Sequence, residues 1–113
     1  MAGHERAGES AVNLASIAEI DGLVHQPARL SILALLYVVE RAEFLYLHRQ
    51  TGLTRGNLSS HLSTLEEAGY VEVSKEFVDK RPLTLLRMTE QGRAAFDAYR
   101  QRMKRFLDAI PAP

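Results

Sequence analysis

Side chains that can form hydrogen bonds are concentrated between Thr54 and Thr64 of this 113-residue chain. An Asn amide both donates and accepts, a hydroxyl does the same on one oxygen, and Arg presents a fixed fork of donors. No carboxylate interrupts the stretch, whose small or polar members are Thr54, Arg55, Gly56, Asn57, Ser59, Ser60, His61, Ser63 and Thr64. Such a surface suits a polar, negatively charged partner.

The leucines of the same stretch predict the helix that positions these groups. Leu58, Leu62 and Leu65 recur at i, i+4 and i+7, which is typical of a helix with one buried side. Gly52 interrupts the segment before it, and Thr54 is a preferred N-cap residue. We therefore expect a helix, a tight turn and a second helix.

A helical wheel assigns the exposed side of this second helix. At about 100° per residue, the side opposite Leu58 is occupied by Gly56, Ser60, Ser63 and Glu67. Gly56 costs about 1 kcal/mol of helix propensity relative to Ala, a cost that would be justified if the helix backbone pressed close to a partner. The alternative is a solvated polar face that merely tolerates glycine. Glu67 indicates that the C-terminal end of the helix points away from such a negatively charged partner.

The flanking segments predict a mainly helical α+β fold with a small β-hairpin. Residues 27–39 are apolar nearly all round, as expected of a central helix, and a helix from Arg41 to about Gln50 follows. After Gly69 the apolar period changes from 3.6 to 2, which predicts two strands. The remaining expected elements are strands at 70–78 and 82–88, a charged tip at 79–82, and a helix from the Thr89 N-cap to about Ile110.

The N-terminal region divides into two parts. Residues 1–10 have no apolar period and are expected to form a mobile tail, so that residues 11–113 form one domain. A short first helix is expected from about Val12 to Asp21, with Leu14, Ile17 and Ile20 on one side.

Composition limits the classes of protein. Fourteen basic residues balance fourteen acidic ones, which argues against a protein coated in positive charge, although residues 51–113 carry ten Lys/Arg against eight Asp/Glu. Cysteine is absent, which excludes disulfides and thiolate sites. The chain shows neither a signal-peptide pattern nor an apolar run of about 18 residues, so we expect a cytoplasmic protein without membrane contact.

The order of elements and two sequence blocks resemble a known family. The blocks GLTRGNLSSHLSTLEEAGYVEVSKEF and RPLTLLRMTEQGRAAF resemble the winged helix–turn–helix transcriptional regulators of the MarR/ArsR kind, in their short single-domain group. The resemblance runs from about His25 to Tyr99. It implies a winged helix that binds double-stranded DNA as a homodimer, and it names neither an operator nor a ligand.

The hairpin of such a fold is the wing. Lys75, Lys80 and Arg81 are its candidates for contact with phosphates or a minor groove, although a charged hairpin tip is often merely solvated. Asn57 and Arg55 at the start of the second helix are the candidates for base or phosphate contacts, alongside Thr54, Gly56, Ser59, Ser60, His61, Ser63 and Thr64.

The last expected helix has an apolar stripe with two interpretations. Phe96, Tyr99, Met103, Phe106 and Ile110 are spaced by three or four residues. The stripe could fold back on its own domain, or it could pair with a second subunit together with Leu14, Ile17 and Ile20. Because the set is large for a small domain with its own central helix, we favour a two-fold dimer on a palindromic site.

Other functions are less well supported. The four histidines show no short ligand spacing, so no metal or other cofactor is expected. Neighbouring Ser59, Ser60 and His61 point in different directions on a helix, and no nucleophile elbow or phosphate loop appears, so no enzyme is expected. The leading hypothesis is a sequence-specific homodimeric regulator, expected to be a repressor. The alternative is a winged-helix protein-interaction module, and a further hypothesis is an unidentified small-molecule effector in the dimer cleft.

Overall fold

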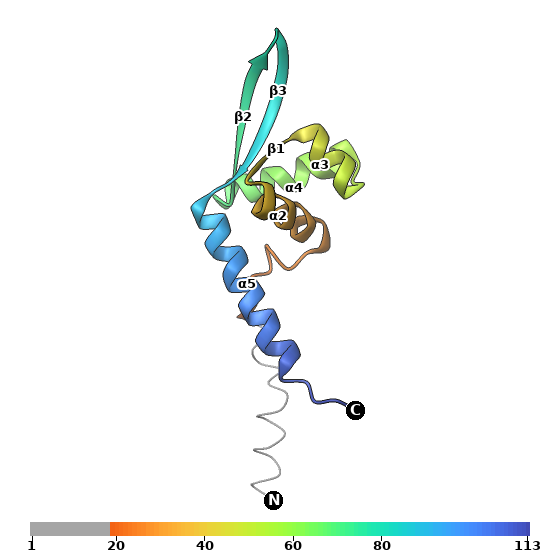
Figure 1. Ribbon diagram of the computed structural model, residues 1–113, viewed down its shortest axis with the longest axis vertical. Coiled ribbons are helices and arrows are strands. Elements are labelled where there is room, and N and C mark those ends of the chain that lie inside the picture. Colours follow the sequence, from red (N-terminus) through yellow and green to blue (C-terminus); the bar gives the residue numbers. More distant parts are fainter. Residues whose placement is uncertain (1–18) are drawn as a thin grey trace, which may run out of the picture.

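Four helices and a three-stranded sheet make up the part of the chain that the computed structural model describes, residues 19–113. In chain order the elements are α2 (Pro27–Val39), β1 (Arg41–Glu43), α3 (Phe44–Thr51), α4 (Arg55–Glu67), β2 (Val71–Val78), β3 (Arg81–Met88) and α5 (Glu90–Asp108). Figure 1 shows α2, α3 and α4 grouped beside the base of the β2–β3 hairpin, with α5 running away from it. The expected mainly helical fold with a wing is confirmed, whereas the expected tail and most of the helix from Val12 lie outside the described residues.

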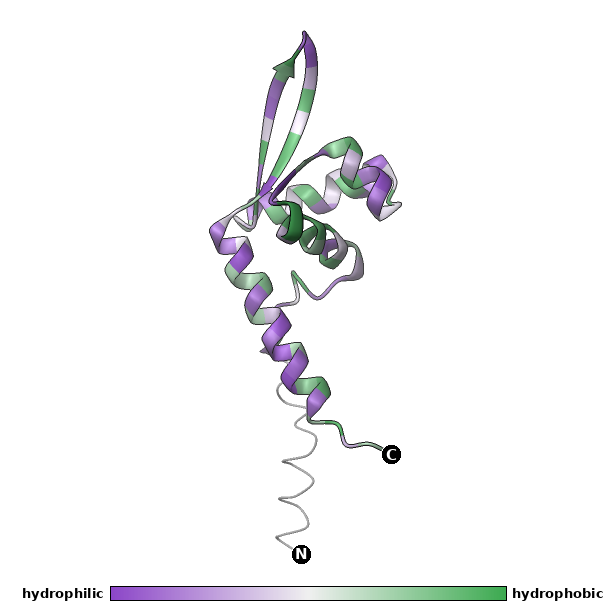
Figure 2. Cartoon of the chain, viewed as in Figure 1, coloured by the Kyte–Doolittle hydropathy of each residue, from purple (hydrophilic) through white to green (hydrophobic). Residues whose placement is uncertain are grey.

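Helix α2 is the centre of the domain. Pro27 occupies its first position, and the Gln26 side chain caps it by accepting a hydrogen bond from the Arg29 N–H at 2.8 Å. Ile32, Leu33 and Leu36 are fully buried, and the ribbon of α2 is hydrophobic nearly all round in Figure 2. Burial on several sides is what an all-apolar helix requires, so the prediction for this segment is confirmed.

The predicted helix from Arg41 to Gln50 is wrong in its first three residues. Arg41–Glu43 form β1, which pairs antiparallel with β3, with Ala42 opposite Leu86. Glu40 ends α2 with a φ of 70°, and its carbonyl accepts a hydrogen bond from the Met88 N–H at 3.1 Å. Residues 41–43 are therefore extended because they pair with a strand more than forty residues away along the sequence. Helix α3 begins only at Phe44.

The turns around α4 follow the sequence prediction. Gly52 ends α3 with a φ of 71°, a left-handed conformation that glycine adopts without steric cost. Thr54 caps α4 by accepting a hydrogen bond from the Asn57 N–H at 3.1 Å. Gly69, with a φ of 82°, follows the end of the helix, and the next N–H, of Tyr70, bonds back to the Leu65 carbonyl at 2.9 Å. The helix–turn–helix is thereby complete.

The wing is the β2–β3 hairpin of a sheet ordered β1-β3-β2. Its turn is shorter than the predicted tip, because Arg81 and Pro82 already belong to β3. Asp79 and Lys80 form the turn with φ values of 51° and 66°, as the two-residue turns that match strand twist require. Pro82 pairs with Phe77, beyond the stretch of β3 that β1 covers. That position tolerates a missing N–H.

The buried residues form one cluster that joins the helices to the sheet. It consists of Val24, Ile32, Leu33, Leu36, Leu47, Leu58, Leu62, Leu65, Val71, Leu86, Met88, Phe96 and Tyr99. Among residues 19–113, no helix is long and apolar enough to cross a membrane.

Candidate nucleic-acid interface

The first turn of α4 is open to solvent. Arg55, Gly56 and Asn57 are all exposed, and a methyl group placed on Gly56 would meet nothing within 4 Å. The Thr54 cap satisfies one backbone N–H of this turn, while the first N–H groups of a helix have no acceptor inside it. Together with the positive end of the helix dipole, this turn provides donors and charge for an anion.

The rest of α4 is divided between a buried side and an exposed polar side. Leu58, Leu62 and Leu65 are buried, as their spacing predicts. Beyond the first turn the exposed polar residues are Ser59, Ser60 and Ser63, followed by Glu66 and Glu67 at the C-terminal end. The arrangement leaves three hydroxyls on the solvent side of α4.

Two predicted contact residues of α4 are half-buried and hold internal contacts. Thr64 donates its hydroxyl hydrogen to the Ser60 carbonyl at 3.2 Å. The His61 Nδ1 lies 3.4 Å from the Arg29 guanidinium of α2. Both side chains are therefore less free to meet a partner than the three serines.

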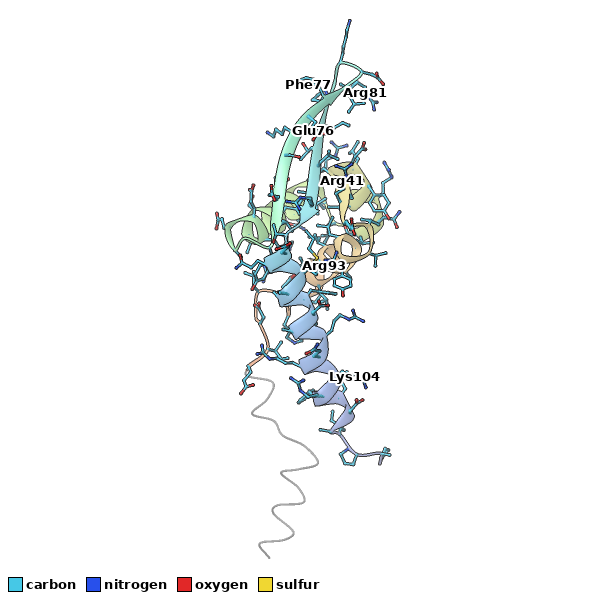
Figure 3. All side chains as sticks on the ribbon, turned by 60° about the vertical axis from the view of Figure 1, so that its left-hand side comes forward. Arg41, Glu76, Phe77, Arg81, Arg93 and Lys104 are labelled. Carbon is cyan, nitrogen blue, oxygen red and sulfur yellow. The ribbon has the colours of Figure 1, made fainter. Side chains whose placement is uncertain are left out.

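The wing has two faces that its register separates. Side chains directly opposite each other in an antiparallel pair project from the same face. We call the inner face the one formed by Val73, Lys75, Phe77, Pro82, Thr84 and Leu86. The outer face carries Arg81, opposite Val78, and Glu76, opposite Leu83; Figure 3 shows Phe77 and Arg81 on different sides near the tip.

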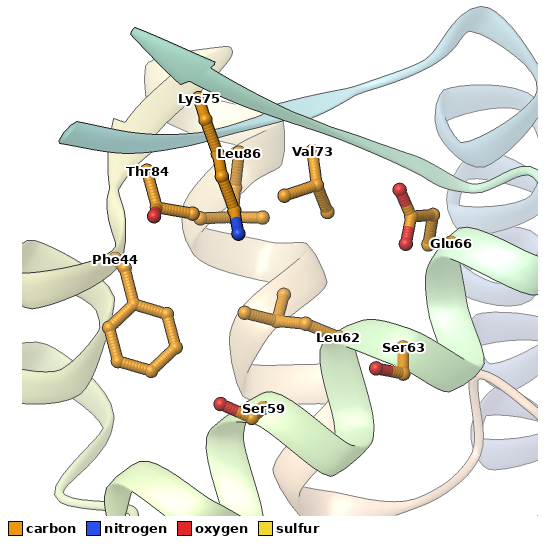
Figure 4. Close-up of a pocket in the computed structure, with 9 residues that line it drawn as sticks. All are labelled: Phe44, Ser59, Leu62, Ser63, Glu66, Val73, Lys75, Thr84 and Leu86. Atoms are coloured by element: carbon orange, nitrogen blue, oxygen red, sulfur yellow. The ribbon is translucent and has the colours of Figure 1, made fainter. Parts of the chain in front are cut away.

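The inner face of the wing and the exposed side of α4 enclose a hollow of about 400 Å³. Leu62 and Leu86 form part of its floor, and Ser59 and Ser63 approach it from α4 (Figure 4). Lys75 projects into the hollow from above, while Glu66 lies toward the C-terminal end of α4. The structure therefore brings Lys75 together with α4, whereas Lys80 lies at the turn and Arg81 on the outer face.

The stripe on α5 is divided between the core and the surface. Phe96 and Tyr99 are each only 7% exposed; the Phe96 ring centroid lies 5.1 Å from that of Tyr37, and the Tyr99 hydroxyl lies 2.9 Å from His25 Nδ1. These two residues thus fold back on their own domain and are not available to pair with a second subunit, contrary to the favoured expectation for them.

The end of α5 keeps apolar surface. Met103 packs against the core, Phe106 is half-buried, and Ile110 is 47% exposed. Leu107, which the stripe omits, is 56% exposed. Ile20 packs against the core, and Leu14 and Ile17 lie outside the described residues.

A helix–turn–helix followed by a hairpin, with α4 exposed beside the wing, defines a winged helix–turn–helix domain. Residues 28–107 match the family described as the winged helix DNA-binding domain. The chain therefore belongs to the winged helix DNA-binding domain family.

Relatives and solved structures agree with this assignment. The uncharacterized protein MJ0432 of Methanocaldococcus jannaschii is 48% identical over 71 residues, 63% of this chain and 77% of the relative. The structure of a transcriptional regulator homologue from Pyrococcus horikoshii superposes with a TM-score of 0.80 at 30% identity, covering 84% of this chain and 96% of that one. A MarR-family regulator from Silicibacter pomeroyi has the same fold, with a TM-score of 0.62 at 24% identity over 93% of this chain and 69% of that one. The expected resemblance to winged helix transcriptional regulators is confirmed, and the likeness to the MarR-family structure is one of fold.

Proposed function

We propose that this transcriptional regulator binds double-stranded DNA sequence-specifically as a homodimer and acts as a repressor. The observation that carries the proposal is the exposed, carboxylate-free first half of α4 beside the inner face of the wing. Asn57 and Arg55 would contact base edges or phosphates, and the serines would contact either. Lys75 would contact the phosphate backbone that runs past the hollow.

Selection of duplexes from a random library tests sequence-specific binding. The full chain should enrich a two-fold symmetric sequence, and the double variant Arg55→Ala with Asn57→Ala should abolish retarded migration of that duplex. Lys104→Ala is the matched control, because it removes one exposed charge from α5, far along the chain from the wing. No binding of any duplex at low salt would contradict the proposal and favour a protein-interaction module.

The salt dependence of binding tests the individual basic residues. Each lost phosphate contact should flatten the slope of log affinity against log salt by about 0.9. We expect this change for Lys75→Ala and Lys80→Ala. The outer-face position of Arg81 predicts a smaller change for Arg81→Ala. An unchanged slope in all three variants would remove the wing from the phosphate contacts.

The dimer is supported by the apolar surface at the end of α5. Exposed Leu107 and Ile110, with half-buried Phe106, form a surface that water disfavours. A two-fold pair of chains would place two α4 helices about 34 Å apart, one turn of DNA. Light scattering at tens of micromolar should give twice the chain mass, and Leu107→Glu should shift it toward one chain. A monomeric unmodified chain would contradict this part of the proposal.

An effector in the dimer cleft remains a separate proposal. Its support is the fold shared with NadR, whose structure was solved in complex with the aromatic acid 4-hydroxyphenylacetate. Thermal unfolding of the full chain against a panel of small aromatic acids would test it, since a ligand that binds only the folded state raises Tm. No shift with any member of the panel would count against an effector of that class.

A further inference from the structure

The wing carries an aromatic side chain that the domain does not use. Phe77 is 77% exposed, although the other described phenylalanines are buried or half-buried. It lies two residues before the Asp79–Lys80 turn, beyond the part of β3 that β1 covers. Folding therefore gains little from this phenyl group, which leaves it free to contact a partner.

The register gives Phe77 a definite direction. It belongs to the inner face, two residues beyond Lys75, and that face borders the hollow between α4 and the wing. Pro82 lies directly opposite Phe77 and adds a rigid apolar ring on the same face. The inner face thus continues from a cation at the hollow to an apolar pair near the tip.

The surrounding charges indicate which partner fits. Lys75 precedes Phe77 on the inner face, and the turn beyond it holds Asp79 and Lys80 and is followed by Arg81, whereas Glu76 lies on the outer face. A second wing in contact with this face would bring like charges together. A polyanion with an apolar interior, such as a DNA duplex approached from the minor groove, satisfies both the lysines and the phenyl group.

We propose that Phe77, backed by Pro82, is an apolar wedge that enters the minor groove and partly unstacks one base step of each half-site. The wedge rests on the proposed binding of duplex DNA by α4 and the wing. It adds a source of specificity without hydrogen bonds to bases, because pyrimidine–purine steps unstack and kink more readily than others. The preferred operator would then contain such a step where each wing meets the DNA.

Three variants separate the wedge from the other wing contacts. Phe77→Ala removes the phenyl group, and Phe77→Leu keeps an apolar side chain that can still wedge. Val78→Ala is the matched control, because Val78 is also exposed but lies on the outer face. All three changes lie on the surface, so the fold should persist.

The experiment uses the duplex selected by the unmodified chain, with fluorophores at its ends and 2-aminopurine placed at successive steps. Binding should bend the duplex and brighten 2-aminopurine at one step per half-site. Phe77→Ala should lose the bend and the fluorescence, and its preference for a pyrimidine–purine step should fall by roughly tenfold. Its salt slope should stay unchanged, while Phe77→Leu and Val78→Ala should resemble the unmodified chain.

Two results would overturn the wedge alone. One is a Phe77→Ala complex that is bent and fluorescent like the unmodified one. The other is a lower oligomeric mass of Phe77→Ala without DNA, which would assign the phenyl group to a protein contact. No duplex binding by the unmodified chain would instead overturn the proposed function together with the wedge.

Discussion

Helices α4 and α5 both begin with a threonine N-cap and a glycine in the first turn, but the first turn of α4 is exposed and that of α5 packs against the domain. The Thr54 hydroxyl of α4 accepts a hydrogen bond from the Asn57 N–H at 3.1 Å, and the Thr89 hydroxyl of α5 accepts one from the Gly92 N–H at 2.9 Å. Each first turn also contains a glycine, Gly56 or Gly92. Cap and glycine alone therefore do not distinguish a binding turn from a packing turn.

The surroundings of the two glycines make the distinction. A methyl group on Gly92 would lie 2.2 Å from the Tyr70 carbonyl oxygen, whereas one on Gly56 would meet nothing within 4 Å. Thr89 is also tied to the wing, since its backbone N–H bonds to that Tyr70 carbonyl at 3.1 Å. Gly92 is needed because the backbone of α5 packs closely against that of Tyr70. Gly56 has no such neighbour, so the space beside it is open to a binding partner.

The largest expected effect is that of Gly92→Ala. The clashing atom belongs to the backbone of Tyr70 and cannot rotate away, so α5 must shift against the base of the wing. We expect the free energy of unfolding to fall by about 3 kcal/mol, at the upper end of overpacking costs. Urea denaturation monitored by circular dichroism measures it. A loss below about 1 kcal/mol would mean that α5 is not held at this contact.

The second effect concerns the charges of the two first turns. The first turn of α5 contains Glu90, which suits the positive end of a helix, whereas that of α4 contains Arg55 and no acid. Arg55→Glu should therefore raise the free energy of unfolding by about 0.5 kcal/mol and weaken DNA binding by roughly 1–3 kcal/mol, a factor of about five or more.

The reverse exchange is the control for this charge effect. Glu90→Arg should lower the free energy of unfolding by a similar amount and leave the affinity for the selected duplex unchanged. Urea denaturation and fluorescence anisotropy measure the two quantities. If Arg55→Glu leaves DNA binding intact, the first turn of α4 does not face the duplex.

The sequence predicts the elements with local signals and misses those that depend on distant pairing. The Thr54 and Thr89 caps, Gly69 and the leucine stripe of α4 act over a few residues and were predicted correctly. Residues 41–43 have no strand pattern of their own, and only β3 makes them a strand. The burial of Phe96 in its own domain depends on the direction in which α5 leaves the sheet, and the residues near Phe96 in the sequence do not indicate that direction.

The same limit applies to the candidate site. Helical spacing was enough to predict which side of α4 is exposed. Whether Lys75 and Arg81 share a face of the wing depends on the length of the turn, and the two-residue turn at Asp79 and Lys80 separates them. The sequence predicts Phe77 only as a strand residue, because alternation identifies a face of a strand without saying whether the domain covers that face.

The third effect is that of Gly56→Ala, the counterpart of Gly92→Ala. Open space around this position lets alanine express its helix propensity, so we expect a gain of about 1 kcal/mol in the free energy of unfolding. The added methyl group should lower the affinity for the selected duplex by roughly threefold to tenfold, because it keeps the helix backbone from approaching the DNA. Tighter binding of the more stable variant would contradict the contact assigned to Gly56.

The smallest effect concerns Tyr70, the residue whose backbone packs against the start of α5. The Tyr70 hydroxyl donates a hydrogen bond to an Asp21 carboxylate oxygen at 2.7 Å. This bond, then burial and the negative charge of Asp21, raise the pKa of Tyr70 from 10.0 to about 12. Tyr70→Phe should lower the free energy of unfolding by about 1 kcal/mol at neutral pH without changing DNA affinity.

The pH dependence of that difference gives a check on its cause. Between pH 10 and 12 the unfolded chain loses the Tyr70 proton while the folded chain still holds it, so stability falls as pH rises. The advantage of the unmodified chain over Tyr70→Phe should therefore be constant below about pH 9 and disappear as pH approaches 12. A difference that does not vary with pH would assign the loss to packing of the ring edge. A change in DNA affinity would show that the contacts behind α5 also position α4, and that the two helix starts are coupled.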